Sequence, residues 1–303
     1  MSSKPMAPIA MFAFNRVEHL RRAVESLAAC PEAPHSALTL YCDGARRPDE
    51  QAAVEAVRRY AAGITGFASV TVDAAPANRG LAASVMRGVA DQLNRFDAVI
   101  VLEDDLVVSP HFLRYMNDAL AHYADDPRVA SVHGYSYPTP EPLPDTFFLQ
   151  GADCWGWATW ARAWKHFEPD GAKLLAELRR RRLTRAFDLD GSYPYAAMLA
   201  DQIAGRNSSW AIRWHAACYL RGLLTLYPGR SLVENIGNDS SGTHCETSDA
   251  MSRAPTTRPV AVGGIPVEPC EPARAAFARF LAGQRSWRAR VRGSVRRLLR
   301  VEA

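Results

Sequence analysis

The first half of the chain alternates short apolar runs with amphipathic segments, and this alternation constrains the fold more than any other feature. Five apolar runs have the length and composition of strands: residues 9–14, 37–42, 68–72, 98–102 and 129–133. Four segments between them carry apolar residues at helical spacing: residues 17–29, 49–62, 80–93 and 109–123. Strands that alternate with helices indicate an α/β fold, in which a largely parallel sheet carries helices on both faces.

The second half departs from this alternation. Three helical patterns are predicted there, at residues 174–187, 210–222 and 273–300. Residues 147–167 are rich in tryptophan and glycine, and residues 235–244 are rich in glycine, serine and asparagine, which predicts a loop. The prolines of residues 256–272 indicate a connector before the last, basic helix.

Composition narrows the class of protein. The formal net charge of +4 over 303 residues is small and does not indicate binding to nucleic acid. No apolar run is long enough to predict a membrane span, and the short polar start of the chain is unlike a secretion signal. The six cysteines are scattered without a C-x-x-C pair, so we expect free thiols and a cytoplasmic protein.

Three of the predicted strands end in polar clusters. The clusters are Asn15-Arg16, Asp43-Gly44 and Glu103-Asp104-Asp105. Ligands of open α/β sheets bind beyond the carboxyl ends of the strands. We therefore expect a ligand site at these strand ends.

The acidic triplet has the chemistry of a metal site. Strand alternation would place Glu103 and Asp105 on one side of the sheet and Asp104 on the other. Three carboxylates that repel one another are costly unless a cation or hydrogen-bond donors offset them. Mg²⁺ and Mn²⁺ prefer such oxygen ligands and keep places for substrate phosphates and water. The alternative interpretation is a solvated acidic turn.

The segment 99–112, Val-Ile-Val-Leu-Glu-Asp-Asp-Leu-Val-Val-Ser-Pro-His-Phe, resembles the acidic metal-binding segment of GT-A fold glycosyltransferases. The likeness is closest to the N-acetylglucosaminyltransferase I type and bacterial family-2-like relatives, and it spans about residues 9–244. It implies a GT-A fold, α/β and Rossmann-like, with Mn²⁺ or Mg²⁺ held by Asp105. It also implies transfer from a UDP-sugar to a glycan or lipid-linked acceptor, with inversion, in surface polysaccharide assembly.

The resemblance also assigns the parts of the chain. Residues 1–255 would form the GT-A domain, with 1–134 binding the nucleotide sugar and 135–255 binding the acceptor. Residues 256–303 would form a connector and a basic amphipathic helix. Such a helix suits peripheral contact with the anionic inner face of the cell membrane. A solvated helix that packs on the domain is the alternative interpretation of the same pattern.

Several residues are predicted to hold the nucleotide. Phe14, Asn15 and Arg16 resemble the first nucleotide-contacting turn of the family, in which Arg16 would pair with phosphate. Asp43 matches an aspartate that accepts the N–H of the uracil imide in these relatives. Asn15 as a helix cap and Asp43 as a turn residue are the alternatives.

A second group of predicted nucleotide contacts lies before the third helix and in the triplet. Arg79 would reach a phosphate, and Gly80 would let the backbone approach the ligand closely. Within the triplet, one carboxylate would bind the metal while Glu103 or Asp104 holds the ribose. A helix cap is the alternative for the Arg79-Gly80 turn.

The acceptor side is expected in the tryptophan-rich part. Its candidate sugar-binding residues are Trp155, Gly156, Trp157 and Trp210, because aromatic faces stack on the C–H surfaces of sugars; a tryptophan-rich core is the alternative. Relatives carry the general base just before a tryptophan, where this chain has Ser208-Ser209. Asp201 is the substitute that we name, although an acid on a helix surface fits the pattern too.

Residues 235–245 resemble a loop that closes over the donor, and His244 within it is a candidate metal ligand or phosphate partner. Two other functions stay open. A nucleotidyltransferase would carry a glycine-rich loop after the first strand, and the glycine-free turn Phe14-Asn15-Arg16 argues against it. A sugar-nucleotide-binding protein with weak or no catalysis is favoured by the serines at 208–209.

Overall fold

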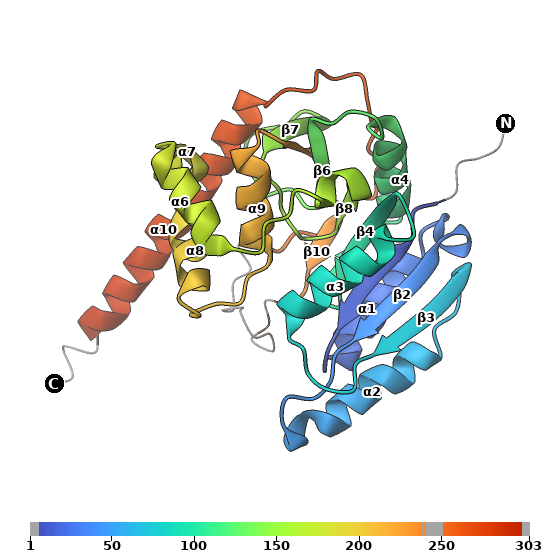
Figure 1. Ribbon diagram of the computed structural model, residues 1–303. Helices are drawn as coiled ribbons and strands as arrows, with labels where there is room; N and C mark the ends of the chain where they lie inside the picture. Colours follow the sequence, from blue (N-terminus) through green and yellow to red (C-terminus); the bar gives the residue numbers. More distant parts are fainter. Residues whose placement is uncertain (1–5, 238, 240–250, 299–303) are drawn as a thin grey trace.

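An eight-stranded sheet organises the described part of the chain, which comprises residues 6–237, 239 and 251–298 of a computed structural model (Figure 1). The order of the strands across the sheet is β3-β2-β1-β4-β8-β6-β9-β7. Their bounds are β1 Ile9–Ala13, β2 Ala37–Cys42, β3 Ser69–Ala74, β4 Ala98–Glu103, β6 Val129–His133, β7 Thr146–Gln150, β8 Trp157–Trp160 and β9 Leu224–Pro228. A separate two-stranded sheet pairs β5, Leu106–Val108, with β10, Val233–Asn235.

Most strands of the large sheet point the same way. β3, β2, β1 and β4 are successively parallel, and β6 is parallel to β9. β8 lies antiparallel between β4 and β6, and β7 is antiparallel to β9 at the edge. The expected α/β class with a mostly parallel sheet is therefore confirmed.

Helices cover both faces of this sheet, as Figure 1 shows. The bounds of the main helices are α1 Val17–Ala28, α2 Gln51–Ala62, α3 Leu81–Leu93, α4 Phe112–His122, α5 Ala161–Trp164, α6 Gly171–Arg180, α7 Thr184–Phe187, α8 Tyr195–Ile203, α9 Ala211–Leu220 and α10 Glu271–Leu298. One core cluster joins the sheet to α1, α2 and α4, and a second joins its other face to α3, α6, α8 and α9.

Alternation within the strands explains these two cores. On β1, Ile9 and Met11 face the α1 side, whereas Ala10 and Phe12 face the α3 side. All five residues of β1 are buried, because a parallel strand covered on both faces has no side for solvent. The uninterrupted apolar run of this strand follows from that burial.

The second half holds elements that the sequence pattern did not predict. Strands β7, β8 and β9 come from short runs, and helix α8 lies where we expected no helix. The helix predicted at 174–187 is two helices, α6 and α7, because Arg182 between them adopts a positive φ of 59°. A non-glycine residue in that region of φ and ψ ends a right-handed helix.

The last helix, α10, begins on the domain and extends past it (Figure 1). Ala273, Phe277 and Leu281 are buried, and Phe277 packs on Phe147 and Tyr227. Side chains from residue 285 onward lie outside the described residues, and so does the expected membrane-facing surface. Within the described residues, none of the helices combines the length and apolar character that a membrane span requires.

Candidate active site

The predicted strand ends open into one cavity of about 690 Å³. One end of it is lined by residues that follow β1, β2 and β4: Phe14, Asn15, Arg16, Asp43, Glu103, Asp104 and Asp105. The other end is lined by residues of the second half: Tyr135, Tyr137, Asp153, Trp155, Tyr193, Tyr195 and Trp210. A cavity of this size can hold a nucleotide-sized ligand together with part of a second one.

Strand direction explains why the two ends meet. β8 is antiparallel to β4, and Trp157 at its start pairs with Val101 near the end of β4. The residues just before β8 therefore lie beside the acidic triplet that follows β4. β6 is also antiparallel to β8 and therefore runs in the same direction as β4, so that the residues after His133 reach the same edge of the sheet.

Arg16 holds the two aspartates of the triplet. Its Nη2 donates to Asp104 Oδ1 at 2.5 Å and to Asp105 Oδ2 at 2.8 Å. The backbone N–H of Phe14 donates to the other oxygen of Asp104 at 3.3 Å. Both aspartates are buried, so one guanidinium offsets two negative charges with little help from solvent.

The expected alternation of the triplet is wrong. β4 ends at Glu103, and Asp104 and Asp105 form a turn before β5. Because the chain turns there, the period of two no longer applies, and both aspartates reach Arg16. Glu103 is the triplet residue whose side chain forms no hydrogen bond within the described residues, although it lines the cavity.

Negative charge at this turn is only partly offset. Burial, together with the nearby Asp105 and Asp104, raises the pKa of Glu103 to about 8. Burial also raises the pKa of Asp104 to about 6, although Arg16 acts to lower it. Such shifts are typical of carboxylates that lack a counter-charge, and they mark this turn as a functional candidate.

The segment after β10 is packed directly on Asp105. The N–H of Ile236 donates to the backbone oxygen of Asp105 at 2.9 Å. A Cβ at Gly237 would overlap the Asp105 carboxylate and approach Arg16 Nη1 to 3.0 Å. Gly237 is thus required because the backbone passes against the carboxylate. His244, further along the predicted closing loop, lies outside the described residues.

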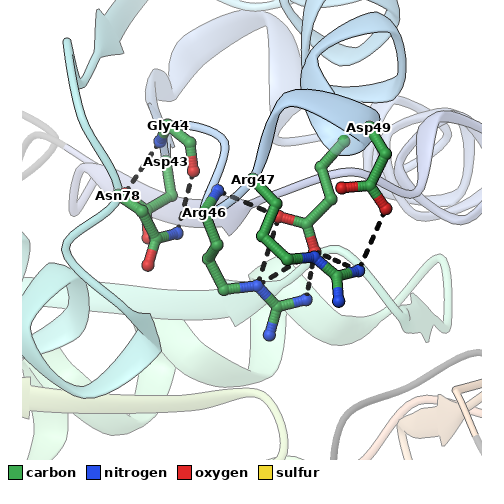
Figure 2. A network of polar contacts seen from close by, with 7 residues as sticks. Asp43, Gly44, Arg46, Arg47, Asp49 and Asn78 are labelled. Carbon is green, nitrogen blue, oxygen red and sulfur yellow. Dashed lines mark hydrogen bonds and ion pairs between the residues drawn. The ribbon is translucent and has the colours of Figure 1, made fainter.

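Asp43 accepts hydrogen bonds from four donors of the protein, of which Gly44 and Asn78 are drawn in Figure 2. Its Oδ1 accepts from the N–H groups of Gly44 and Arg79 at 2.9 and 2.8 Å. Its Oδ2 accepts from Asn78 Nδ2 at 3.0 Å and from the N–H of Gly80 at 2.8 Å. A carboxylate has about four acceptor positions. The prediction that Asp43 accepts a uracil N–H is therefore not supported by this geometry.

The Arg79-Gly80 turn is shaped by this anchor. Gly80 has a φ of 79°, which favours glycine, and its missing side chain leaves open space rather than a close contact. The backbone conformation alone therefore favours a glycine here, and the expected close approach to a ligand stays a prediction. The Arg79 side chain is exposed and does not line the cavity, whereas Gly80 does.

Phe14 and Arg46 form one wall of the cavity at the end that holds the acidic turn. The Arg46 guanidinium lies 5.0 Å from the centre of the Phe14 ring. Arg46, labelled in Figure 2, is held in turn by Glu50, with Nη2 to Oε1 at 2.6 Å. Asn15 lines the cavity beside them. Sequence reasoning missed Arg46, although it lies only two residues after the second polar cluster, Asp43-Gly44.

The tryptophan candidates separate into two kinds. Trp155 and Trp210 line the cavity, and Trp155 lies edge-on to Tyr135 at 4.8 Å. Trp157 is 1% exposed and stacks under Trp210 at 5.3 Å, so it belongs to the core instead of a sugar site. Gly156, with a φ of 63°, packs against Val233 and Phe112 and does not line the cavity.

The expected base is placed outside the cavity. Asp201 lies on α8 with 46% of its side chain exposed, and it pairs with Arg206 at 2.5 Å. Ser208 and Ser209 do line the cavity, as their sequence position suggested. The carboxylate that sequence reasoning missed is Asp153, which lies just before the tryptophan-rich segment and lines the cavity.

The acidic turn fits a divalent cation in its chemistry. Glu103 and Asp105 supply the hard oxygen donors that Mg²⁺ and Mn²⁺ prefer, and the raised pKa of Glu103 shows that its ionised form is costly unless a cation lies beside it. Over residues 6–237, 239 and 251–298, no three His, Cys, Asp or Glu side chains group as a metal site. Mg²⁺ is usually bound through one or two carboxylates together with substrate phosphates.

Comparison with known proteins adds only distant likenesses. No protein-family model matches the chain, and no curated protein matches it in sequence. The solved mannosyltransferase PcManGT from Pyrobaculum calidifontis, in complex with GDP-Man and Mn²⁺, is similar at 12% identity with a TM-score of 0.40. That likeness covers 72% of this chain and 70% of that one.

Two further structures are similar. Mannose-1-phosphate geranyltransferase from Thermus thermophilus has 16% identity and a TM-score of 0.37, covering 77% of each chain. TarS of S. aureus has 11% identity and a TM-score of 0.32, covering 48% of this chain and 24% of that one. At these values the likenesses carry no argument about function, which we take from the site itself.

Proposed function

We propose that this chain transfers a sugar from a UDP-sugar to a hydroxyl group of a glycan or lipid-linked acceptor, with inversion and with Mn²⁺ or Mg²⁺ as cofactor. The observation that supports this is a single cavity in which an acidic turn and Arg16 face a wall of aromatic rings. Transfer between two substrates requires that both lie in one enclosed space with their reacting atoms adjacent.

The donor end would hold the diphosphate. Glu103 and Asp105 would bind the cation, which supplies positive charge to the leaving diphosphate. Arg16 Nη1 is buried and forms no hydrogen bond within the described residues, and it is free to donate to a phosphate oxygen. One arginine would thereby connect the two aspartates to the substrate.

The uracil contact needs a different residue from Asp43. Asn78 donates both of its Nδ2 hydrogens, to Asp43 Oδ2 at 3.0 Å and to the backbone oxygen of Gly44 at 2.8 Å. These two bonds fix the amide, and its Oδ1 remains as an acceptor beside the cavity that Asn78 lines. In our proposal this oxygen accepts the imide N–H of uracil.

We also propose a role in surface polysaccharide assembly at a membrane, which the family resemblance implies. The arginine-rich sequence of residues 273–300 supports it, because basic segments bind anionic lipid. A binding site near such a helix would suit a lipid-linked acceptor.

Isothermal titration of UDP with and without Mn²⁺ tests the proposal. We expect wild-type protein to bind UDP only with Mn²⁺, and Asp105→Ala to lose that binding. Asp118→Ala is the matched control, because Asp118 is a half-exposed carboxylate paired with Arg114 on α4. Folded wild-type protein that binds no UDP under either condition would sink the uridine-donor proposal.

A further inference from the structure

Once Asp201 is excluded, the base that an inverting transfer needs has still to be assigned. Among the described residues, five carboxylates line the cavity: Asp43, Glu103, Asp104, Asp105 and Asp153. Asp43 is engaged by four donors, and Arg16 holds Asp104 and Asp105. Glu103 belongs to the proposed cation site. This leaves Asp153, in the other half of the cavity, without an assigned role.

Asp153 is held in a defined position. It lies between β7 and β8, and its Oδ2 accepts a hydrogen bond from Tyr227 Oη at 2.9 Å. Tyr227 is buried on β9, so the hydroxyl that orients the carboxylate is itself fixed. No other hydrogen bond to Asp153 is formed within the described residues, and its Oδ1 remains as an acceptor. One oxygen anchored and one free is the arrangement that a general base requires.

The cavity wall around Asp153 is aromatic. Tyr135, Tyr137, Tyr195, Trp155 and Trp210 line this end of the cavity. Among the described residues that line the whole cavity, the arginines are Arg16 and Arg46, which both lie at the donor end, and no lysine is present. Burial lowers the pKa of His133 to about 4, so this neighbouring imidazole is neutral near pH 7.

This chemistry selects the kind of acceptor. Aromatic faces and tyrosine hydroxyls suit the C–H surfaces and hydroxyl groups of a sugar. An anionic group on the acceptor would lie close to the carboxylate of Asp153, and the two negative charges would repel each other. The described residues that line this end of the cavity include no cationic side chain that could offset this repulsion. An uncharged saccharide is therefore favoured over a phosphorylated or carboxylated one at this end.

We infer that Asp153 is the general base of the transfer and that the hydroxyl it deprotonates belongs to an uncharged saccharide; this rests on the proposed function. Asp153 Oδ1 takes the proton of the acceptor hydroxyl, and the acceptor oxygen forms the new bond to the anomeric carbon. The bond from that carbon to the phosphate oxygen breaks, and its electron pair leaves with the nucleoside diphosphate. The proton passes from Asp153 to solvent after the product departs.

Paired asparagine variants test this assignment. UDP release from a panel of UDP-hexoses and UDP-N-acetylhexosamines is measured with p-nitrophenyl glycosides as acceptors. Asp153→Asn, which keeps the acceptor for Tyr227, is expected to lower turnover by about 10²–10⁴-fold. Its UDP affinity in the presence of Mn²⁺ is expected to stay within about threefold of wild type, since within the described residues no hydrogen bond joins Asp153 to Arg16, Asn78 or Asp105. Asp201→Asn is the control and is expected to turn over like wild type.

Tyr227→Phe gives a second readout, which does not depend on the fold of the asparagine variant. The hydroxyl orients Asp153 through its hydrogen bond to Oδ2, so its loss should lower kcat while UDP affinity in the presence of Mn²⁺ stays within about threefold of wild type. Wild-type turnover by folded Tyr227→Phe contradicts the assignment of the base.

The outcomes separate the two proposals. Wild-type turnover by a folded Asp153→Asn overturns the inference and leaves the proposed function standing. Transfer that is faster to p-nitrophenyl glycuronides than to the matching neutral glycosides overturns the uncharged-acceptor part. Wild-type protein that binds UDP with Mn²⁺ but releases none from any donor overturns catalysis itself, and Asp153 as a base with it.

Discussion

Replacing Asp43 by asparagine should destabilise the protein, because this carboxylate anchors two loops. Each of its oxygens accepts from two donors, and asparagine turns one oxygen into an NH₂ group that accepts from neither. A buried donor left without a partner costs about 1–3 kcal/mol. Two such donors, with some relaxation of the turn, give a loss of roughly 3 kcal/mol in the free energy of unfolding. In a chain of this size that lowers Tm by roughly 6 °C.

Urea and thermal unfolding of Asp43→Asn, followed by tryptophan fluorescence, measure this loss. Asp49→Asn is the matched control, because Asp49 lies in the next turn with 69% of its side chain exposed (Figure 2). We expect the control to stay within about 0.5 kcal/mol of wild type. A wild-type unfolding midpoint for Asp43→Asn, together with lost UDP binding, would refute the anchor and restore Asp43 as the residue that recognises the nucleotide.

Two further predictions concern the acidic turn. Glu103→Gln should raise the free energy of unfolding by roughly 1–3 kcal/mol at pH 9 and by almost nothing at pH 4, with urea titrations at both pH values as the measurement. The pKa of Glu103 is raised from 4.5 to about 8, chiefly by burial, so between these pH values the native state holds a proton that the unfolded state has lost. The wild-type protein therefore loses stability as pH rises from 4.5 to 8, and the glutamine variant does not. Equal effects of the substitution at both pH values would contradict this. Gly237→Ala should cost about 1–3 kcal/mol and weaken Mn²⁺-dependent UDP binding, because its methyl group would overlap the Asp105 carboxylate. Gly63→Ala, where the added Cβ has only a backbone oxygen at 3.6 Å near it, is the control, and equal behaviour of the two variants would count against the contact.

The first half of the fold could be predicted because its signals are local. The apolar run of β1 and the helical spacing of α1 each lie within about a dozen residues, and parallel strand ends meet at one edge of a sheet by geometry alone. The meeting of Arg16, Asp43 and the acidic triplet follows from that rule. The rule does not predict which hydrogen-bond partners each side chain has. The four donors to Asp43, for example, come from loops that meet only in the folded chain.

The second half could not be predicted in the same way. Strand β8 has four residues, two of them tryptophan, and nothing in its sequence says that it pairs antiparallel between β4 and β6. Trp157 and Trp155 are two residues apart, yet the strand places one in the core and leaves the other in the cavity. The tryptophan-rich segment therefore predicted an aromatic site, but the sequence could not distinguish the tryptophans that line the site from those that lie in the core.

The same pairing explains why Asp153 was missed while Asp201 was named. Asp201 was chosen because it lies close in sequence to the serines at 208–209, but α8 turns that carboxylate outward to Arg206. Asp153 is 74 residues from Tyr227, which orients it, and it precedes β8 by four residues. Because β8 runs antiparallel to β4, the residues before β8 are brought to the edge of the sheet where β4 ends. A strand inserted with reversed direction can thus place a carboxylate opposite the donor residues, where a parallel strand would have placed it at the far edge.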